Sequence, residues 1–344
     1  MKKVIITGVT GMDGSTMVDF LIQNTNNLIV AGIRRLSNNN HKNIEHLKNN
    51  PRFKLIDLDI TDPSNVESVI MEQQPDYFIN FAANSFVGNS WTMPVNHMQT
   101  NCMAVLYQLE AIRKFAPNCK YYQAGSSEEF GDVVIAPQDE SHPIRPRSPY
   151  GASKAAARML VKVYRDSYNL YAIQGWLFNH EGERRGLEFV TRKITTNVAR
   201  IRKAIKTASP FAPLELGNID AKRDWSHAMD FVEGIWLMLN QENPKEYVLS
   251  SNETHTVREF VEKAFQSAGI EGLWTGEGIN EKYVLKNKQD IILMQINEKF
   301  YRPAEVELLL GDSTLAREEL GWAPKVSFEE LVKKMVENDL KLQN

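Results

Sequence analysis

Five polar residues in the middle of the chain could together perform acid–base chemistry. The stretch "AGSSEEFGD" places Ser126, Glu128 and Glu129 at the end of a predicted strand. The stretch "SPYGASKAA", about twenty residues later, contains Tyr150 and Lys154 at a spacing that puts both on one face of a helix, one turn apart. A phenol with a pKa of about 10 is a poor base at neutral pH. An adjacent ammonium is one of the charges that could lower this pKa into a useful range.

Three glycines near the N-terminus are spaced as in a dinucleotide-binding loop. In "VIITGVTGMDGSTMVDFL", Gly8, Gly11 and Gly14 lie between a predicted strand and a predicted helix. Glycines there permit a tight turn and let backbone N–H groups approach a pyrophosphate at the helix N-terminus. The spacing is G-x-x-G-x-x-G, so glycines needed only for the turn are the alternative interpretation. The position directly after the first strand favours the nucleotide.

The end of the second predicted strand indicates which dinucleotide is bound. An acidic residue at this point would bind a ribose 2′-OH, but Arg34, Arg35 and Ser37 stand there instead and suit a 2′-phosphate. We therefore expect NADP rather than NAD, with two solvated arginines as the alternative. Asp59, at the end of the third strand, could accept a hydrogen bond from the adenine amino group or could be a turn residue.

The elements that position these residues alternate between short apolar runs and longer amphipathic segments. This pattern predicts a Rossmann-like α/β fold with a doubly wound parallel sheet, extending to about residue 178. The later part predicts a smaller mixed α/β lobe over 179–344, from which segments at about 217–252 return to the first domain. The predicted strands cover 4–8, 28–34, 53–60, 77–83, 120–127, 171–179, 213–218 and 246–251, and the predicted helices cover 15–24, 66–74, 105–115, 188–205, 257–269 and 328–344.

The composition limits the possible partners. The 344 residues are 42% hydrophobic and 24% charged, with a formal net charge of −3, so charge alone would recruit neither nucleic acid nor a membrane surface. Cys102 and Cys119 are too few for a disulfide framework and lack the paired spacing of a zinc site. The N-terminus has no long apolar stretch, so we expect a cytoplasmic protein without a signal peptide or membrane span. We expect no metal, because the seven histidines are scattered.

Taken together, these motifs resemble the extended short-chain dehydrogenase/reductase family, in which a Ser or Thr, a Tyr and a Lys perform hydride chemistry on nucleotide sugars. Four longer stretches are similar to successive motifs of the GDP-mannose 4,6-dehydratases and extend the resemblance over nearly the whole chain. They are "LFNHEGERRGLEFVTRKI", "LGNIDAKRDWSHAMDFVEGIWLML", "ETHTVREFVEKAF" and "RPAEVELLLGD".

The resemblance implies an activity, an NADP cofactor, a GDP-sugar substrate and a homotetramer built from dimers, with the "RRLSNNN" loop near a neighbouring subunit's cofactor. The implied catalytic set is Ser126, Glu128, Tyr150 and Lys154. The implied cofactor residues are those of the glycine loop with Met12 and Asp13, the strand-end residues Arg34, Arg35, Ser37 and Asp59, and Ala82, Ala83, Tyr150, Lys154, His180 and Arg185. The implied GDP-sugar residues are Ser85, Asn179, Val190, Lys193, Arg223, Arg302 and Glu305.

Several of these assignments agree with simple chemistry. Arg223 and Lys193 can bind a diphosphate. Glu305 could accept hydrogen bonds from N1–H and the 2-amino group of guanine, a donor pair that uracil and thymine lack. His180 has no paired ligand spacing and is expected to form hydrogen bonds or packing contacts rather than to bind a metal.

The chain also departs from the family pattern. Ser126 stands where threonine is usual, "MDG" replaces "QDG", "EEF" replaces "ELY" and "EGERRG" replaces "ESPRRG". Leu36 interrupts the usual run of arginines and serines, and "ANSFVGNSW" replaces "AQSHVGVSF" beside the sugar. The hexose therefore stays open between GDP-mannose and a GDP-manno-heptose. Nucleotide-sugar epimerases, decarboxylases and dTDP-sugar dehydratases are the alternative enzymes, and an NADP-sensing regulator is the non-enzymatic one; the intact serine, tyrosine and lysine argue against the regulator.

The two adjacent glutamates are expected to differ in role. A 4,6-dehydratase needs a group that removes the C5 proton and protonates the departing 6-hydroxyl, and the resemblance selects Glu128. Glu129 is expected to point the other way, because successive strand residues face opposite sides, and to be structural or solvated.

Overall fold

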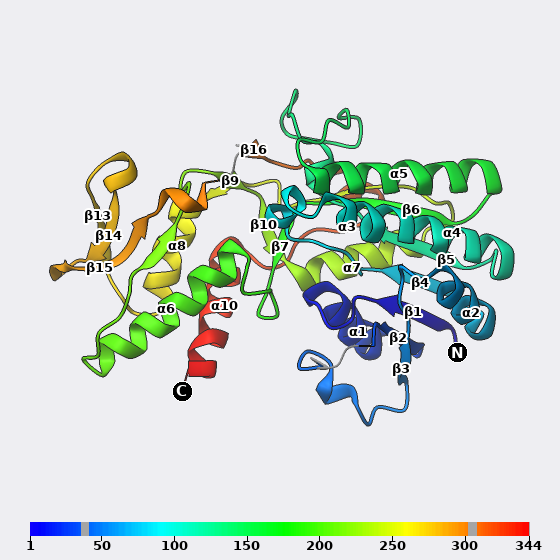
Figure 1. Ribbon diagram of the computed structural model, residues 1–344, viewed down its shortest axis with the longest axis horizontal. Coiled ribbons are helices and arrows are strands. Elements are labelled where there is room, and N and C mark those ends of the chain that lie inside the picture. Colours follow the sequence, from blue (N-terminus) through cyan, green and yellow to red (C-terminus); the bar gives the residue numbers. More distant parts are fainter. Residues whose placement is uncertain (36–40, 302–307, 344) are drawn as a thin grey trace.

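Seven parallel strands form the largest sheet in the part of the chain that the structure describes, in the order β11-β6-β5-β4-β1-β2-β3 (Figure 1). The computed structural model describes residues 1–35, 41–301 and 308–343. Within it, the strands of this sheet are β1 (Lys3–Thr7), β2 (Leu28–Ile33), β3 (Phe53–Asp57), β4 (Tyr77–Asn80), β5 (Lys120–Ala124), β6 (Ala172–Leu177) and β11 (Val248–Leu249). The order reverses between β1 and β4, and in such sheets ligands bind at the carboxyl ends of the strands beside this point.

Helices cover both faces of this sheet, as the predicted doubly wound fold requires. Because successive strand residues face opposite sides, Val4 and Ile6 of β1 pack in one apolar cluster and Ile5 in another. The first cluster contains α1 (Met12–Asn24), α7 (Ala228–Leu239) and α9 (Thr314–Leu320). The second contains α2 (Pro63–Gln73), α4 (Ala104–Phe115) and α5 (Pro149–Tyr168). α3 (Pro94–Met98) precedes α4 and continues into it through a short π-helical segment, Gln99–Met103.

A smaller lobe with its own apolar cluster lies to the left in Figure 1. Its helices are α6 (Val190–Lys206), α8 (Val257–Ser267) and α10 (Phe328–Gln343). They pack on a mixed sheet of β13 (Gly272–Thr275), β14 (Lys282–Leu285), β15 (Lys288–Ile296) and β8 (Leu214–Leu216). Two small sheets lie between the lobe and the large sheet. One pairs β10 (Trp225–His227) with β7 (Asn179–Glu181), and the other pairs β9 (Lys222–Arg223) with β12 (His255–Thr256) and β16 (Leu308–Leu309). The predicted fold class is confirmed.

Two elements late in the chain, one strand and one helix, pack with the large sheet and its helices. β11 pairs in parallel with β6, and α7 packs with α1 in the first apolar cluster. The sequence analysis did not predict β13, β14 and β15 as strands and did not single out α7 as a helix. The predicted strand over 171–179 is divided in the structure into β6 and β7.

Candidate active site

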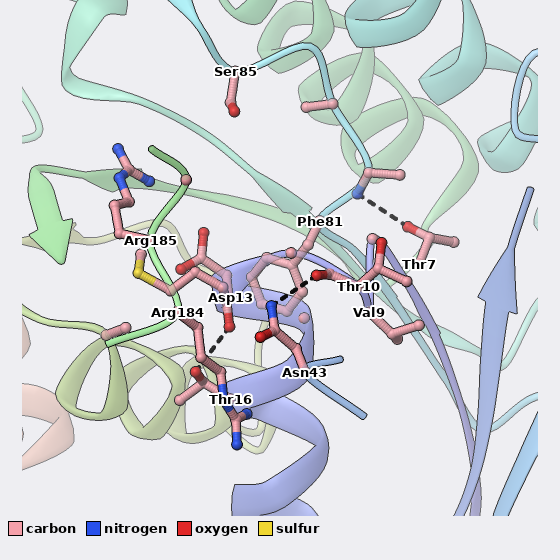
Figure 2. Close-up of a pocket in the computed structure, with 18 of the residues that line it drawn as sticks. Thr7, Val9, Thr10, Asp13, Thr16, Asn43, Phe81, Ser85, Arg184 and Arg185 are labelled. Carbon is pink, nitrogen blue, oxygen red and sulfur yellow. Dashed lines mark hydrogen bonds between the residues drawn. The ribbon is translucent and has the colours of Figure 1, made fainter. Parts of the chain in front are cut away.

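The glycine loop after β1 fits against the end of β4 so closely that side chains are excluded. Gly8 has a φ of +69°, and a Cβ on it would lie 2.7 Å from the amide nitrogen of Ala82. A Cβ on Gly14 would lie 2.3 Å from the carbonyl oxygen of Gly8. The amide of Ala82 also donates a hydrogen bond to Oγ1 of Thr7 at 3.2 Å (Figure 2). These glycines are therefore required by the local packing as well as by any ligand.

The loop opens into a cavity of about 1440 Å³. α1 begins at the cavity wall with Gly11 as its N-cap, and no side chain among the described residues caps its first N–H groups. Uncapped N–H groups at a helix N-terminus bind anions such as a pyrophosphate. The predicted cofactor residues that line this cavity are Gly8, Gly11, Met12, Asp13, Gly14, Arg34, Asp59, Ala82, Ala83 and Arg185. Its size, its open helix terminus and its arginines fit a nicotinamide dinucleotide.

The residues predicted to choose between NADP and NAD have different positions. Arg34 is exposed and lines the cavity, whereas Arg35 is exposed but is absent from the described residues that line it. Ser37 lies outside the described residues. Asp59 lines the cavity, but its Oδ1 already accepts hydrogen bonds from the backbone and hydroxyl of Thr61, at 2.9 and 2.7 Å. Asp59 is therefore a turn residue that faces the cavity, and its hydrogen bond with an adenine amino group stays a prediction.

A second cavity, of about 490 Å³, adjoins the first. Asp13, Ala83, Ser85 and Arg185 line both cavities, and Figure 2 shows Asp13, Ser85 and Arg185 around one space. The second cavity contains the whole predicted catalytic set, Ser126, Glu128, Tyr150 and Lys154. It also contains most of the predicted sugar-nucleotide residues, namely Asn179, Val190, Lys193 and Arg223, together with His180. Arg302 and Glu305 lie outside the described residues.

The predicted base and its neighbours are buried. Tyr150 is 7% exposed, and burial raises the pKa of its phenol, while a hydrogen bond with the Ser126 side chain acts in the opposite direction. Lys154, 2% exposed, donates to the carbonyl oxygen of Ala124 at 2.8 Å, and its Nζ lies 5.9 Å from the centroid of the Tyr150 ring. Burial lowers the pKa of Lys154 to about 8, although Glu129 and Asp13 oppose this effect. The lysine is thus mostly cationic at neutral pH.

Asp13 and His180 form an ion pair at the junction of the two cavities. Nε2 of His180 lies 3.0 Å from Oδ1 of Asp13, and its Nδ1 lies 2.8 Å from the carbonyl oxygen of Phe178. The ring stacks on Phe231 with a centroid distance of 4.6 Å. His180 therefore makes the hydrogen-bonding and packing contacts expected of it. Within the described ranges, no group of three or more His, Cys, Asp or Glu side chains is arranged to hold a metal ion.

The two glutamates after β5 have the different environments that were expected, but the reason given was wrong. Glu128 lines the second cavity, whereas Glu129 is 0% exposed and pairs with Arg158 at 2.5 Å. Strand alternation does not separate them, because Ser127–Glu129 form a 3-10 turn that Ser126 caps. Of the two roles left open for Glu129, solvated is excluded and structural is confirmed.

Sequence reasoning missed the aromatic and basic lining of the second cavity. Phe189 contacts Phe86 edge to face at 5.9 Å, and Nζ of Lys193 lies 3.4 Å from the centroid of Phe300. The further lining residues include Trp91, Asn218, Trp225, Lys299 and Tyr301. They come from separate loops and short strands, so no spacing in the sequence links them.

None of the described helices is long and apolar enough to cross a bilayer.

The comparison with known proteins agrees with this geometry. The model of the family described as "GDP-mannose 4,6 dehydratase" matches residues 5–335. This chain belongs to that family. A GDP-mannose 4,6 dehydratase of Drosophila melanogaster is 44% identical over 350 residues, covering 99% of this chain and 87% of the relative. The human GDP-mannose 4,6 dehydratase is 41% identical, covering 98% and 91%. The resemblance inferred from the motifs is confirmed.

Solved structures of lower identity have the same fold. A dTDP-glucose 4,6-dehydratase from Bacillus anthracis, in complex with NAD, has a TM-score of 0.81 and 23% identity, covering 99% of this chain and 97% of the other. RMD from Pseudomonas aeruginosa, complexed with NADPH, has a TM-score of 0.77 and 19% identity, covering 99% and 100%. At these identities the likeness concerns the fold alone.

Proposed function

We propose that this protein removes water from GDP-mannose to give GDP-4-keto-6-deoxy-mannose, with NADP as a cofactor that is not consumed. The observation that carries the proposal is the single cavity shared by Ser126, Glu128, Tyr150 and Lys154, adjoining the cavity of the glycine loop. Membership of the GDP-mannose 4,6-dehydratase family supports the choice of reaction and substrate.

The sugar nucleotide is assigned to the second cavity. Arg223 and Lys193 line it and suit the diphosphate by charge. Burial lowers the pKa of Lys193, although Glu215 opposes this effect. Asn179 and Val190 flank the same space. Phe86 and Trp91 lie in the "ANSFVGNSW" stretch that departs from the family pattern, which keeps GDP-manno-heptose as the second candidate substrate.

The first chemical step needs a base at the sugar 4-hydroxyl. When bound, the nicotinamide cofactor supplies a hydride acceptor for C4 and later a hydride donor for C6. Tyr150 takes the 4-hydroxyl proton as the C4–H bond breaks, and Ser126 positions the phenol through their hydrogen bond. The cationic Lys154 beside the ring favours the phenolate over the phenol.

Elimination then needs a second acid–base group. The 4-keto group acidifies the C5 proton, and the phenol bonded to the 4-oxygen is too far away to serve both C5 and the 6-oxygen. Glu128, on the turn beside the cavity, removes the C5 proton and delivers a proton to the departing 6-hydroxyl. The net change is the loss of one water if the hydride taken from C4 is returned to C6 and C5 takes up a proton, which balances the proton that Tyr150 received from the 4-hydroxyl and must release.

The cofactor is proposed to be NADP rather than NAD because Arg34 faces the cavity where an acidic residue would bind a ribose hydroxyl. The neighbour from Pseudomonas aeruginosa was solved with NADPH and that from Bacillus anthracis with NAD, so the fold accepts either cofactor. A homotetramer built from dimers and a cytoplasmic location belong to the same proposal, and light scattering of the purified protein tests the oligomer.

The deciding experiment incubates the purified protein and NADP with GDP-mannose, GDP-manno-heptose, dTDP-glucose and UDP-glucose separately. Mass spectrometry should find loss of one water from GDP-mannose, without accumulation of reduced cofactor. Exclusive dehydration of the heptose would move the substrate assignment to the second candidate. Accumulation of reduced cofactor, or an isomer of unchanged mass, would instead indicate a dehydrogenase or an epimerase.

A further inference from the structure

The turn that carries Ser126 and Glu128 is held in place by the buried carboxylate of Glu129. Oε1 of Glu129 accepts hydrogen bonds from the backbone N–H of Ser126 at 2.8 Å and from the side-chain amide of Gln174 at 2.9 Å. Its other oxygen accepts from Nε of Arg158 at 2.5 Å. Glu129, Gln174 and Arg158 are 0%, 0% and 2% exposed. This carboxylate therefore fixes the backbone of one catalytic residue without entering the cavity.

The same contacts extend to the helix that carries the base. The amide of Gln174 that bonds Glu129 also donates to the backbone carbonyl of Lys154, at 3.3 Å. Arg158 lies one turn after Lys154 on α5 and also donates to the carbonyl oxygens of Gln174 and Gly175, at 2.9 and 3.3 Å. Its guanidinium lies 3.5 Å from the centroid of the Trp176 ring. The turn and the helix are thus joined through β6.

Glu129 is the most buried carboxylate paired with Arg158. Arg158 also pairs with Glu246 at 2.8 Å, which is shared with Arg165 at 2.9 Å, and Arg165 pairs in addition with the half-exposed Asp166 at 3.4 Å. Removing the charge of Glu129 therefore leaves the buried Arg158 with only a share of the Glu246 carboxylate among these pairs. A buried uncompensated charge acts strongly on its neighbours because little solvent screens it.

We propose that Glu129, held by Arg158, is a positioning residue for the reaction: it fixes the turn that presents Ser126 and Glu128, and it is a buried negative charge that acts on Lys154 together with Asp13. The proposal rests on the proposed function.

The electrostatic contribution has a defined direction. Burial lowers the pKa of Lys154, and the charges of Glu129 and Asp13 oppose it. Glu129 also acts with burial to raise the pKa of Tyr150. Loss of its charge should therefore lower the pKa of both groups. The charged and titratable groups around the pair include Asp13 from α1, paired with His180 from β7, and His97 from α3, whose ring packs edge-on against Tyr150. They also include Glu128 and Glu129 from the turn, Arg158 from α5, and Arg185 from the loop after β7.

The test is a titration of Lys154 in the purified protein without substrate or cofactor. NMR of protein labelled with ¹³C-lysine follows its side chain, and the resonance is identified by its loss in Lys154→Arg. The wild-type midpoint is expected at about 8. In Glu129→Gln, which keeps an oxygen for the Ser126 N–H, it should fall by about one unit. An unchanged midpoint in folded Glu129→Gln overturns the proposal.

Glu246→Gln is the matched control, because it removes the other carboxylate from Arg158, and in the described part of the chain the side chain of Glu246 bonds Arg158 and Arg165. The control therefore leaves the hydrogen bonds of Glu129 with the Ser126 N–H and with Gln174 in place. Its Lys154 midpoint should move by less than half of the shift in Glu129→Gln. An equal or larger shift in Glu246→Gln would assign the effect to Arg158 alone and overturn the role of Glu129.

Activity gives an independent readout. With GDP-mannose, both limbs of the pH profile of kcat/KM should move to lower pH in Glu129→Gln, whereas a purely structural defect lowers kcat/KM without moving them. If the protein dehydrates no GDP-mannose, the proposed function fails while the titration still tests the inference. Should Glu129→Gln not fold, the double variant E129L/R158M removes both charges at similar volume. It should fold yet lose at least about tenfold in kcat/KM, because the Ser126 N–H loses its acceptor; wild-type kcat/KM in this variant overturns the proposal.

Discussion

The carboxylate of Asp13 and the imidazole of His180 lie 3.0 Å apart, one at the start of α1 and the other on β7. The contact joins the glycine loop to the strand that leads into the smaller lobe. Burial alone would lower the pKa of His180, but the charge and hydrogen bond of Asp13 raise it above its usual value. Burial would raise the pKa of Asp13, but His180 lowers it.

This pair predicts a pH-dependent contribution to stability. His180 stabilises the fold while it is protonated, so its contribution is lost as pH rises through its raised pKa; that of Asp13 is lost as pH falls through its lowered pKa. Asp13→Asn should therefore reduce the free energy of unfolding by about 1–3 kcal/mol near pH 5.5 and by less near pH 8.5, measured in urea. Asp62→Asn is the control, since Asp62 caps α2 through backbone N–H groups and should lose a similar amount at both pH values. Equal losses for Asp13→Asn at both values would contradict the prediction.

Cofactor choice is expected to depend on Arg34 more than on Arg35. Both are exposed, but only Arg34 is among the described residues that line the cofactor cavity. Arg34→Gln should weaken NADP binding about tenfold or more and leave NAD binding almost unchanged, because a charge-assisted hydrogen bond to the 2′-phosphate is lost. Arg35→Gln should change NADP binding less. Calorimetry with both cofactors measures this, and tighter binding of NAD than NADP by the wild type would defeat the assignment.

Much of the fold could be predicted because the parallel sheet has a strong local pattern. Its strands are short and apolar, and the glycines, the serine and the Tyr–Lys pair lie at their ends or on the next helix, so the position of each site residue follows from the element before it. The lobe was harder. Its strand β15 contains the polar residues Lys288, Gln289 and Asp290 before the apolar run, and β14 pairs with it through register shifts, so the sequence shows no regular alternation there. The domain boundary at residue 178 stays a prediction.

The part of the site that could not be predicted depends on contacts between distant segments. The burial of Glu129 follows from Arg158 and Gln174, which lie 29 and 45 residues further along the chain. Asp13 contacts His180 only because the fold brings β7, which follows β6, next to the start of α1. Such partners carry no common spacing in the sequence.

Alanine substitutions at Gly8 and Gly269 would distinguish the free-energy cost of a left-handed backbone from the cost of a steric clash. Both have a positive φ, of +69° and +72°, but a Cβ on Gly269 would have no heavy atom within 4 Å. Gly269→Ala should cost only the left-handed conformation, about 1–2 kcal/mol. Gly8→Ala must also displace the backbone of Phe81 and Ala82, so it should cost about 2–5 kcal/mol and abolish cofactor binding. Urea unfolding and calorimetry test both, and normal cofactor binding by Gly8→Ala would contradict the predicted fit.

Tyr150 is expected to be the base for C4 oxidation. Tyr150→Phe removes only a hydroxyl, so the fold and NADP binding should persist while turnover falls at least about 100-fold. Tyr168→Phe, on the same helix but half exposed and outside the cavity lining, is the control and should turn over normally. Product formation is followed by the loss of one water in mass spectrometry. Wild-type turnover by Tyr150→Phe would mean that another group is the base.

Glu128 is expected to act only after C4 has been oxidised, which separates its loss from that of Tyr150. Glu128→Gln keeps the shape of the turn but cannot remove the C5 proton, so it should still produce a transient reduced cofactor and a 4-keto sugar that retains its 6-oxygen. In deuterated water the wild-type product should gain deuterium at C5, and the variant should largely fail to exchange there. Glu67→Gln, on the surface of α2, controls for the loss of a carboxylate. A normal rate of dehydration by Glu128→Gln would show that the elimination uses another residue, whereas loss of the reduced-cofactor signal as well would place Glu128 in the first step.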